Sequence, residues 1–480
     1  MTVVTATAPA GRALPKDTTV ALVLVLGSIM VSLDMTVVNV ALNGLSREFD
    51  TSLTAIGWTV TGYTLALAAV VPASAWAAGR FGAKRLYLAA IALFTAGSVL
   101  AGLAWDVPSL VLFRAVQGLG GGLVMPTGMT ILVRAAGPDR LGRLMGTLGL
   151  AILVGPLAGP ALGGRLLDAV SWRALFLINL PIGLAVLLIG GRILPADGPA
   201  ERRPLDRGGL LLLPPGLVLL VYGVTTGGER GGFTAPGALV PLLAGAVLVA
   251  AFAVRRVPHP LIDVRLFRER GFAAAAATLA LFSAGYFGTM LFAPLYLQLV
   301  RGESATVAGL VGIPAALASG TAMQVAGRVA DKVPPGRLVP AAVATALAGY
   351  ALFTVQLTAD ASYWGLWAAM LLMGAGGGAT MMPAMTAAAR AVPREQAAAA
   401  STAVNLLNTT MNAVGTAVAS VVLTALLPVA GGLQGLHRLP PGARDAIAPD
   451  LAAAFRHSYV LALVLMALAL VPALLLPRRT

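Results

Sequence analysis

Two charged side chains of opposite sign stand inside long apolar stretches of this 480-residue sequence. Asp34 lies in "SLDMTVVNVAL" and Arg114 in "LFRAVQGLGGGLVMP", with Gln117 about one helical turn after the arginine. A charge at the centre of an apolar membrane helix costs about 2.5–3.5 kcal/mol on insertion scales, so such a group usually faces a cavity or a partner and marks a pathway. We therefore expect Asp34 to face a pathway, where its protonation would respond to the presence of a cationic ligand.

The depth of the two charges predicts that they can meet. Asp34 lies about eleven residues, or ~16 Å, from the outer end of its predicted helix, and Arg114 lies about five residues from the outer end of its own. We therefore expect both in the outer half of the membrane, paired directly or through water. Asp34 could instead lie near the outer headgroups, or serve only as a fixed ion-pair partner of an arginine. Arg114 could instead extend its side chain to the outer surface.

The composition is that of a membrane protein. Hydrophobic residues make up 58% of the chain and charged residues 11%, against about 25% charged in ordinary soluble domains. The chain has no cysteine, which excludes disulfides and thiolate chemistry. It has three histidines, too few to favour a histidine-based metal centre. The formal charge of +14 would favour nucleic-acid binding in a soluble protein, but here it is spread over many short loops. We expect no cofactor and no nucleic-acid partner.

Fourteen apolar stretches are long enough to span a bilayer, which takes about 20 residues in a helix. They run near residues 19–45, 54–78, 86–104, 109–133, 144–167, 172–194, 208–227, 236–256, 272–299, 306–330, 338–357, 361–388, 397–426 and 457–476. Lys and Arg gather in alternate loops, which places both termini in the cytoplasm because cytoplasmic loops accumulate positive charge. The sequence predicts an all-α polytopic membrane protein.

Two six-helix bundles remain when the seventh and eighth stretches are set aside. "GRFGAKR" follows the second stretch and "GRVADKVPPGR" the tenth, at the same place in each half. Repeated halves are typical of secondary transporters that work by alternating access. The predicted parts are a tail at 1–18, an N-terminal bundle at 19–195, a linker with two additional central helices at 196–256, a cytoplasmic amphipathic segment at 257–271, and a C-terminal bundle at 272–476 with a long outward loop near 428–456.

The fifth stretch, "GTLGLAILVGPLAGPALGG", contains a series of small residues and prolines. Gly155, Gly159 and Gly163 repeat every four residues, and this spacing makes a flat face that lets another helix approach closely. Proline loosens the backbone hydrogen bonding of a membrane helix. The series fits a packing surface, a moving surface, or both. Its members are Gly146, Gly155, Gly159, Pro160, Gly163 and Gly164.

From the first to the thirteenth stretch, the sequence resembles the fourteen-span drug/proton antiporter family of the major facilitator superfamily. "LDMTVVNVAL" is similar to the first-helix signature of that family, "RAVQG" to its fourth-helix arginine motif, and the Gly/Pro series to its antiporter motif. "WRALFLINLPIG", "PLIDVRLFRER" and "YLQLVRGESATVAGL" resemble further family segments. The resemblance implies the major facilitator fold, multidrug efflux and a bacterial cytoplasmic membrane.

The inner loop between the second and third helices departs from the family pattern. In the family this loop latches the outward-facing state through charge pairs, for which Arg80 and Arg85 are the candidates here. Gly79 stands where the family usually has an acid, whereas Asp331 keeps that acid in the second half. We therefore expect a weaker latch in the first half.

The resemblance implies proton-driven export of lipophilic drugs or antibiotics, above all cationic ones. Asp34 is the expected proton carrier, and Arg114 tunes its competition with substrate. The expected partners are an amphipathic small molecule, the proton as coupling ion and the bilayer, and we expect a monomer. Candidates for the substrate pocket are the aromatic, soft and polar residues Asn39, Trp58, Tyr63, Gln117, Met125, Tyr286, Phe287, Asn405 and Asn408.

Other functions stay open at this point. A dedicated proton-coupled exporter of one metabolite or lipid, or a proton-coupled importer, would have the same fold. A polytopic membrane enzyme or a receptor is a more remote alternative. An enzyme needs a cluster of acids or histidines at the membrane face. We expect His259 and His437 in loops and His457 at the edge of one, where the last stretch begins. We therefore expect a secondary active transporter and not an enzyme.

Overall fold

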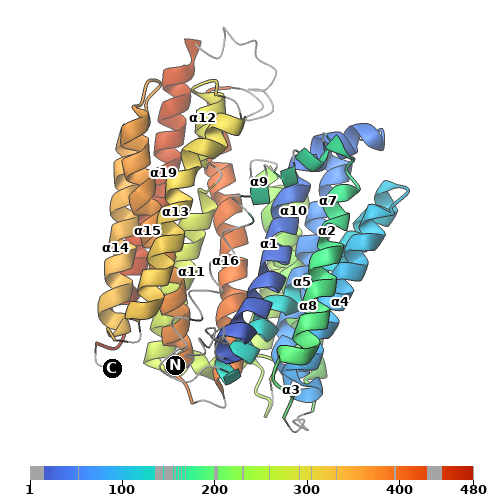
Figure 1. Cartoon of the computed structure of the whole chain (residues 1–480). Helices are drawn as coiled ribbons and strands as arrows, with labels where there is room; N and C mark the ends of the chain where they lie inside the picture. Colours follow the sequence, from blue (N-terminus) through green and yellow to red (C-terminus); the bar gives the residue numbers. More distant parts are fainter. Residues whose placement is uncertain are drawn as a thin grey trace, which may run out of the picture.

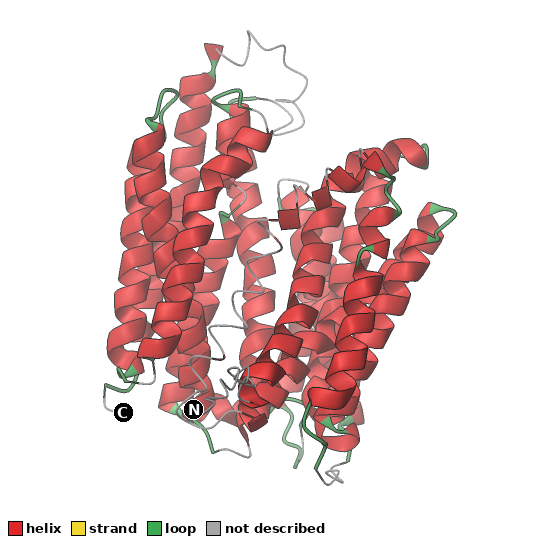
Figure 2. Cartoon of the chain, in the orientation of Figure 1, coloured by secondary structure: helices red, strands yellow, loops and turns green. Residues whose placement is uncertain are grey.

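The structure is a computed structural model of the whole chain. Its described part is helical and contains no strand (Figure 2). The described residues are 16–51, 53–135, 144, 155, 158–159, 162–163, 165–167, 169–198, 204–229, 232–258, 260–290, 292–303, 305–330, 332–393, 396–429 and 446–478.

The N-terminal half contains α1 to α8. Their bounds are α1 Lys16–Glu48, α2 Leu53–Val70, the short 3₁₀ helix η1 Val71–Ala73, α3 Ser74–Phe81, α4 Ala83–Gly102, α5 Val107–Ala135, α7 Ala174–Leu177 and α8 Asn179–Ile193. The predicted span 54–78 is thus divided into α2, η1 and α3. Pro72 lies at the division, and it lacks the N–H that a continuous α-helix would use.

The rest of the chain forms an added hairpin and the C-terminal half. Their bounds are α9 Arg207–Glu229, α10 Pro236–Val254, η2 Val264–Arg268, α11 Arg270–Gly288, α12 Phe292–Leu299, α13 Ala305–Val329, α14 Pro335–Gln356, α15 Tyr363–Arg390, α16 Ala397–Leu426 and α19 Ala448–Leu474. In the amphipathic segment predicted at 257–271, Leu261, Ile262 and Leu266 are buried in the core of the C-terminal half.

Within the described part, 13 helical stretches are long and apolar enough to cross a membrane. Each matches one of the predicted spans; the remaining prediction, 144–167, falls largely outside the described residues. The first described helix begins, and the last one ends, at the same end of the bundle (Figure 1). This arrangement agrees with an even number of spans and with termini on one side of the membrane.

The two halves pack together near the end where the chain begins and ends. Met129 and Leu132 of α5 share one core cluster with Met323 of α13 and Met382 of α15, and Val71 of η1 belongs to the core of the C-terminal half. Figure 1 shows the α1–α8 ribbons and the α11–α19 ribbons converging toward this end and diverging toward the other. Apolar burial therefore holds the cytoplasmic ends together.

The added hairpin of α9 and α10 contacts both halves. At the cytoplasmic end, the Arg255 side chain forms an ion pair with Asp206 at 3.0 Å. Tyr222 of α9 stacks on Trp58 of α2, with ring centroids 5.9 Å apart. Gly228 of α9 lies so close to α16 that a Cβ there would be 3.1 Å from the Cα and Cβ of Ala417. The hairpin therefore bridges α2 of one half and α16 of the other.

The contact between α9 and α16 predicts a specific crosslink. Because the chain contains no cysteine, Gly228→Cys with Ala417→Cys creates a single pair. Its Cβ atoms would lie 3.1 Å apart and must separate slightly to reach the usual disulfide value of about 3.8 Å. We expect oxidation to keep the two fragments joined after cleavage at a protease site placed at residues 257–258, as seen on a non-reducing gel. Leu239→Cys with Ala417→Cys is the control, since Leu239 is an exposed residue of α10. Equal crosslinking of both pairs would contradict the packing.

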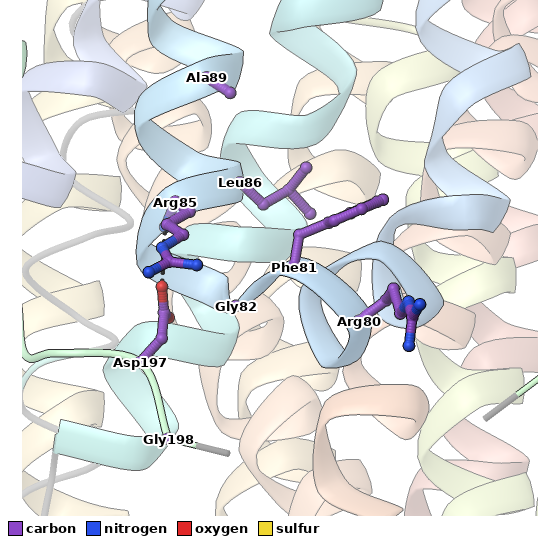
Figure 3. Close-up of a pocket in the computed structure, with 8 residues that line it drawn as sticks. All are labelled: Arg80, Phe81, Gly82, Arg85, Leu86, Ala89, Asp197 and Gly198. Carbon is purple, nitrogen blue, oxygen red and sulfur yellow. Dashed lines mark hydrogen bonds between the residues drawn. The ribbon is translucent and has the colours of Figure 1, made fainter. Parts of the chain in front are cut away.

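The cytoplasmic turn between α3 and α4 is held by Asp197, which follows α8 and is therefore distant in sequence although it lies beside the turn. Gly82 has a φ of +95°, and a Cβ there would overlap the Asp197 carboxylate. That carboxylate accepts hydrogen bonds from the backbone N–H groups of Lys84, at 2.8 Å, and Arg85, at 3.1 Å. Asp197 thus satisfies free donors in the first turn of α4. It lines a cavity of about 620 Å³ together with Arg80, Phe81 and Arg85 (Figure 3).

Removing this cap should destabilise the N-terminal half. We expect Asp197→Ala to lower the free energy of unfolding by ~1 kcal/mol, the usual loss for a helix cap, and to lower the thermal unfolding midpoint of the purified protein. Asp197→Asn should keep most of the stability, since asparagine caps helices about as well as aspartate. An unchanged midpoint in Asp197→Ala would show that the two hydrogen bonds contribute nothing.

Candidate functional site

The centre of the site is an ion pair between two helices of the N-terminal half. Asp34 lies in the middle of α1 and Arg114 in the outer part of α5. The Arg114 Nη1 donates to Asp34 Oδ2 at 2.6 Å, and the two residues are only 1% and 2% exposed. Two residues 80 positions apart in sequence thus lie in direct contact, which is one of the two arrangements that their predicted depths allow.

Gln117 lies on both members of the pair. Its side-chain oxygen accepts from Arg114 Nη1 at 2.7 Å, while its side-chain nitrogen donates to Asp34 Oδ1 at 2.8 Å. Residues three apart on a helix share one face, so α5 presents the guanidinium and the amide to α1 together. Gln117 is fully buried, and its amide dipole lies with the oxygen toward the cation and the N–H toward the anion.

A second amide approaches Asp34 from α8. The Asn179 side-chain nitrogen donates to Asp34 Oδ1 at 3.1 Å and to the Ser98 hydroxyl of α4 at 3.0 Å. The Ser98 hydroxyl in turn donates to the backbone carbonyl of Phe176 at 2.8 Å. Asn179 and Ser98 are both buried. The Asp34 carboxylate is thus hydrogen-bonded directly to α5 and α8, and through Asn179 it is linked to Ser98 of α4.

The guanidinium of Arg114 also contacts residues of α2 and α7. The Arg114 Nε donates to the backbone carbonyl of Thr59 at 3.3 Å. The ring of Tyr63 lies 4.3 Å from the guanidinium carbon, and the ring of Phe176 lies 5.8 Å from it. Aromatic faces attract cations most strongly when water is excluded. The Tyr63 hydroxyl is buried and has no hydrogen-bond partner among the described residues.

These contacts form a closed set around an ionised Asp34. Oδ2 accepts from Arg114, and Oδ1 accepts from the amides of Gln117 and Asn179. Burying two charges is costly unless they are paired and hydrogen-bonded, and removing one partner typically costs about 3–5 kcal/mol. A proton on Asp34 would therefore leave Arg114 as an uncompensated charge in the same place. Protonation of Asp34 would therefore raise the free energy of the buried Arg114 charge.

The glycine series of the fifth predicted span lies against the helix that carries Asp34. A Cβ at Gly155 or Gly159 would overlap Ser32 or Thr36 of α1, respectively. The Thr36 hydroxyl also donates to the Gly155 carbonyl at 2.9 Å. At Gly163 a Cβ would be 3.4 Å from the Val37 carbonyl. These glycines therefore form a packing surface for α1. The other members of the series, Gly146, Pro160 and Gly164, lie outside the described residues.

The remaining candidates of the N-terminal half are dispersed. Met125 accepts a hydrogen bond from Ser28 across α1 and α5, at 3.3 Å from hydroxyl to sulfur. Trp58 stacks on Tyr222 and is 42% exposed. Arg80 and Arg85 line the cytoplasmic cavity beside Asp197. The side chain of Asn39, a residue of α1, lies outside the described set.

Polar and aromatic candidates of the C-terminal half form a separate group on α11 and α16. Tyr286 stacks on Phe282 with centroids 5.4 Å apart and meets the edge of Phe287 at 5.3 Å. Asn408 of α16 accepts a hydrogen bond from Ser283 of α11, and Asn405 is half-buried. Asp331 lies outside the described residues.

Asn179, Ser98 and Thr59 contact the Asp34–Arg114 pair directly or through one another, but they were not among the predicted site residues. We call this whole group of residues the charge cluster. Asn179 stands in "WRALFLINLPIG", where its polar side chain within an apolar span was the available signal. Ser98 and the Thr59 carbonyl carry no such signal, since a serine or a backbone group can be satisfied within its own helix. Within the described part, no group of three or more His, Cys, Asp or Glu residues could hold a metal ion.

Comparison with known proteins agrees with this architecture. Residues 24–416 match the model of the Major Facilitator Superfamily. The Multidrug resistance protein B homolog of Mycobacterium tuberculosis is 38% identical over 95% of this chain and 89% of that protein. Multidrug export protein EmrB of Haemophilus influenzae is 30% identical over 82% of this chain and 78% of that protein.

A solved structure supports the fold independently of these names. A double tryptophan mutant of XylE superposes with a TM-score of 0.64 at 16% identity, covering 95% of this chain and 94% of that one. At this identity the likeness concerns the fold alone. Together with the apolar spans, the family match identifies a multi-pass protein of the bacterial cytoplasmic membrane, a transporter and not an enzyme. The chain belongs to the Major Facilitator Superfamily.

Proposed function

We propose that this transporter exports lipophilic, cationic drugs by proton antiport, with Asp34 as the proton carrier. The observation that carries the proposal is the buried Asp34–Arg114 pair with its two amide donors. Export of drugs is supported by the names of the two relatives, a multidrug resistance protein and a multidrug export protein. The geometry suggests how a proton and a cation would be coupled.

The choice of Asp34 as proton carrier follows from its position. Among the described spans, the acids are Asp34 and Asp450, and Asp450 is the third residue of α19. Asp34 is therefore the acid that lies deep within a described span. Acids in this position are rare and usually belong to ion or proton pathways.

Protonation would change the net charge of the cluster. With Asp34 ionised, the pair with Arg114 is neutral overall; with Asp34 protonated, it carries one positive charge. A positive charge disfavours a second cation nearby, and at low dielectric this repulsion is stronger than in water. A lipophilic cation between the halves and a proton on Asp34 would therefore oppose each other, as antiport requires.

The competition proposed here is indirect. In this conformation Asp34 is buried within the N-terminal half, and its hydrogen-bond partners come from α5 and α8. A substrate pocket between the halves would include Tyr286, Phe287 and the polar face of α16. Substrate would then sense the carboxylate through the charge of Arg114 and through the movement of α5, without touching Asp34.

The first test replaces the proton carrier with a side chain of the same shape. We expect Asp34→Asn to abolish uphill efflux of a lipophilic cation from vesicles, because the amide cannot exchange a proton at any working pH. Downhill movement of the same dye should persist if the protein is folded. Asp197→Asn makes the same acid-to-amide change at the cytoplasmic edge and should remain coupled. Full uphill efflux by Asp34→Asn would refute the proposal.

The second test separates the charge of Arg114 from its hydrogen bonds. Arg114→Gln removes the cation that favours an ionised Asp34, so the pH dependence of efflux should move to higher pH by about one unit or more. Arg114→Lys keeps the charge, and its pH profile should move less. Its maximal rate should fall, since one ammonium cannot replace the guanidinium contacts to Asp34, Gln117 and Thr59. Equal pH shifts in both variants would argue against a charge effect.

A further inference from the structure

The two amides that donate to Asp34 are held in place by different means. The orientation of Gln117 is set by charges, because its oxygen faces Arg114 and its nitrogen faces Asp34. Asn179 contacts no cation in the described part of the cluster; its nitrogen has two acceptors, Asp34 and Ser98. Its side-chain oxygen is buried without a hydrogen-bond partner among the described residues.

A chain of neutral hydrogen bonds fixes Asn179 as a donor. The backbone carbonyl of Phe176 can only accept, so the Ser98 hydroxyl must give its hydrogen to that carbonyl. The Ser98 oxygen is then free to accept, and the Asn179 nitrogen is the group that donates to it. The second hydrogen of the same nitrogen points at Asp34 Oδ1. A reversed amide would place its oxygen against both a carboxylate and a hydroxyl oxygen.

We propose that Asn179 is a positioning residue that holds Asp34 in its ionised form and thereby sets the proton affinity of the carrier. Hydrogen bonds to the charged form of an acid favour that form, and bonds to a charged partner are stronger than neutral ones. Because Ser98 and Phe176 anchor the amide, this donation persists when Arg114 moves. The inference rests on the proposed function in one respect only, that Asp34 exchanges a proton.

Few other titratable groups face this part of α1. Among the described residues, α5 contributes Arg114, and α2 contributes Tyr63, whose ring lies under the guanidinium. From α4, Tyr87 packs on Gly27, about two turns away from Asp34. At the outer end, Arg173 lies 3.8 Å from Glu48 of α1. The described residues of α8 that contact the acid add only the neutral Asn179, so its donation is not masked by another charge from that helix.

The test is a direct titration of the Asp34 carboxyl by infrared difference spectroscopy on the purified full chain. The band of the protonated acid is assigned by its loss in Asp34→Asn. We expect Asn179→Leu, which has a similar shape and no donor, to raise the midpoint pH by about one unit, a tenfold gain in proton affinity. Ser98→Ala frees the amide without removing it, and should raise the midpoint by a smaller amount.

Two further variants separate positioning from a general effect on folding. The double variant Asn179→Leu with Ser98→Ala should match Asn179→Leu alone, because Ser98 acts through Asn179. Thr95→Val is the control. Thr95 is buried on α4 like Ser98, but its hydroxyl donates to the carbonyl of Ile91 in its own helix. Its midpoint should equal that of the wild type.

The outcomes are distinct for the two proposals. An unchanged or lowered midpoint in folded Asn179→Leu would overturn the inference. If that variant does not fold, an unchanged midpoint in Ser98→Ala does the same. The proposed function fails separately, when Asp34→Asn still drives uphill efflux, whatever the titration gives. A raised midpoint in Asn179→Leu and a smaller rise in Ser98→Ala, with Thr95→Val unchanged, would establish Asn179 as the residue that tunes the carrier.

Discussion

The buried ion pair between Asp34 and Arg114 is the constraint on which the rest of the N-terminal half depends. Two opposite charges, 2.6 Å apart and almost fully excluded from solvent, are tolerable only with every hydrogen bond in place. Gln117 and Asn179 supply those bonds from α5 and α8, and the glycines at 155 and 159 let the fifth span lie directly on α1. Helix packing and charge compensation are therefore parts of one arrangement.

The same helix that holds the cation also joins the two halves. Arg114 lies in the outer part of α5, while Met129 and Leu132 at its cytoplasmic end share a core cluster with Met323 and Met382. Fifteen helical residues separate Arg114 from Met129, a distance of about 22 Å along the axis. α5 is continuous between these two contacts but contains Pro126, which removes one backbone hydrogen bond. The helix therefore links the ion pair to the interface between the halves.

Much of this arrangement follows from the sequence, because membrane helices are long and their depth can be counted. The positions of Asp34 and Arg114 relative to their helix ends predicted a pair, direct or through water, and the structure shows the direct contact. Charge-rich loops predicted both termini on one side of the membrane, and the first described helix begins where the last one ends (Figure 1). Helix rotation is not fixed by depth, so the approach of Asn179 from α8 could not be derived. Nor could the role of Asp197, since the acid that caps α4 comes from more than 100 residues away, in a loop without a recognisable signal.

The most direct test of the central claim is proton release on substrate binding. Purified protein in weak buffer, near the midpoint of the Asp34 titration, is mixed with a panel of lipophilic cations while the pH is recorded. The account predicts release of protons by the wild type on binding of a transported cation, and none by Asp34→Asn at matched binding. Equal release by both proteins, or binding to the wild type without release, would contradict it.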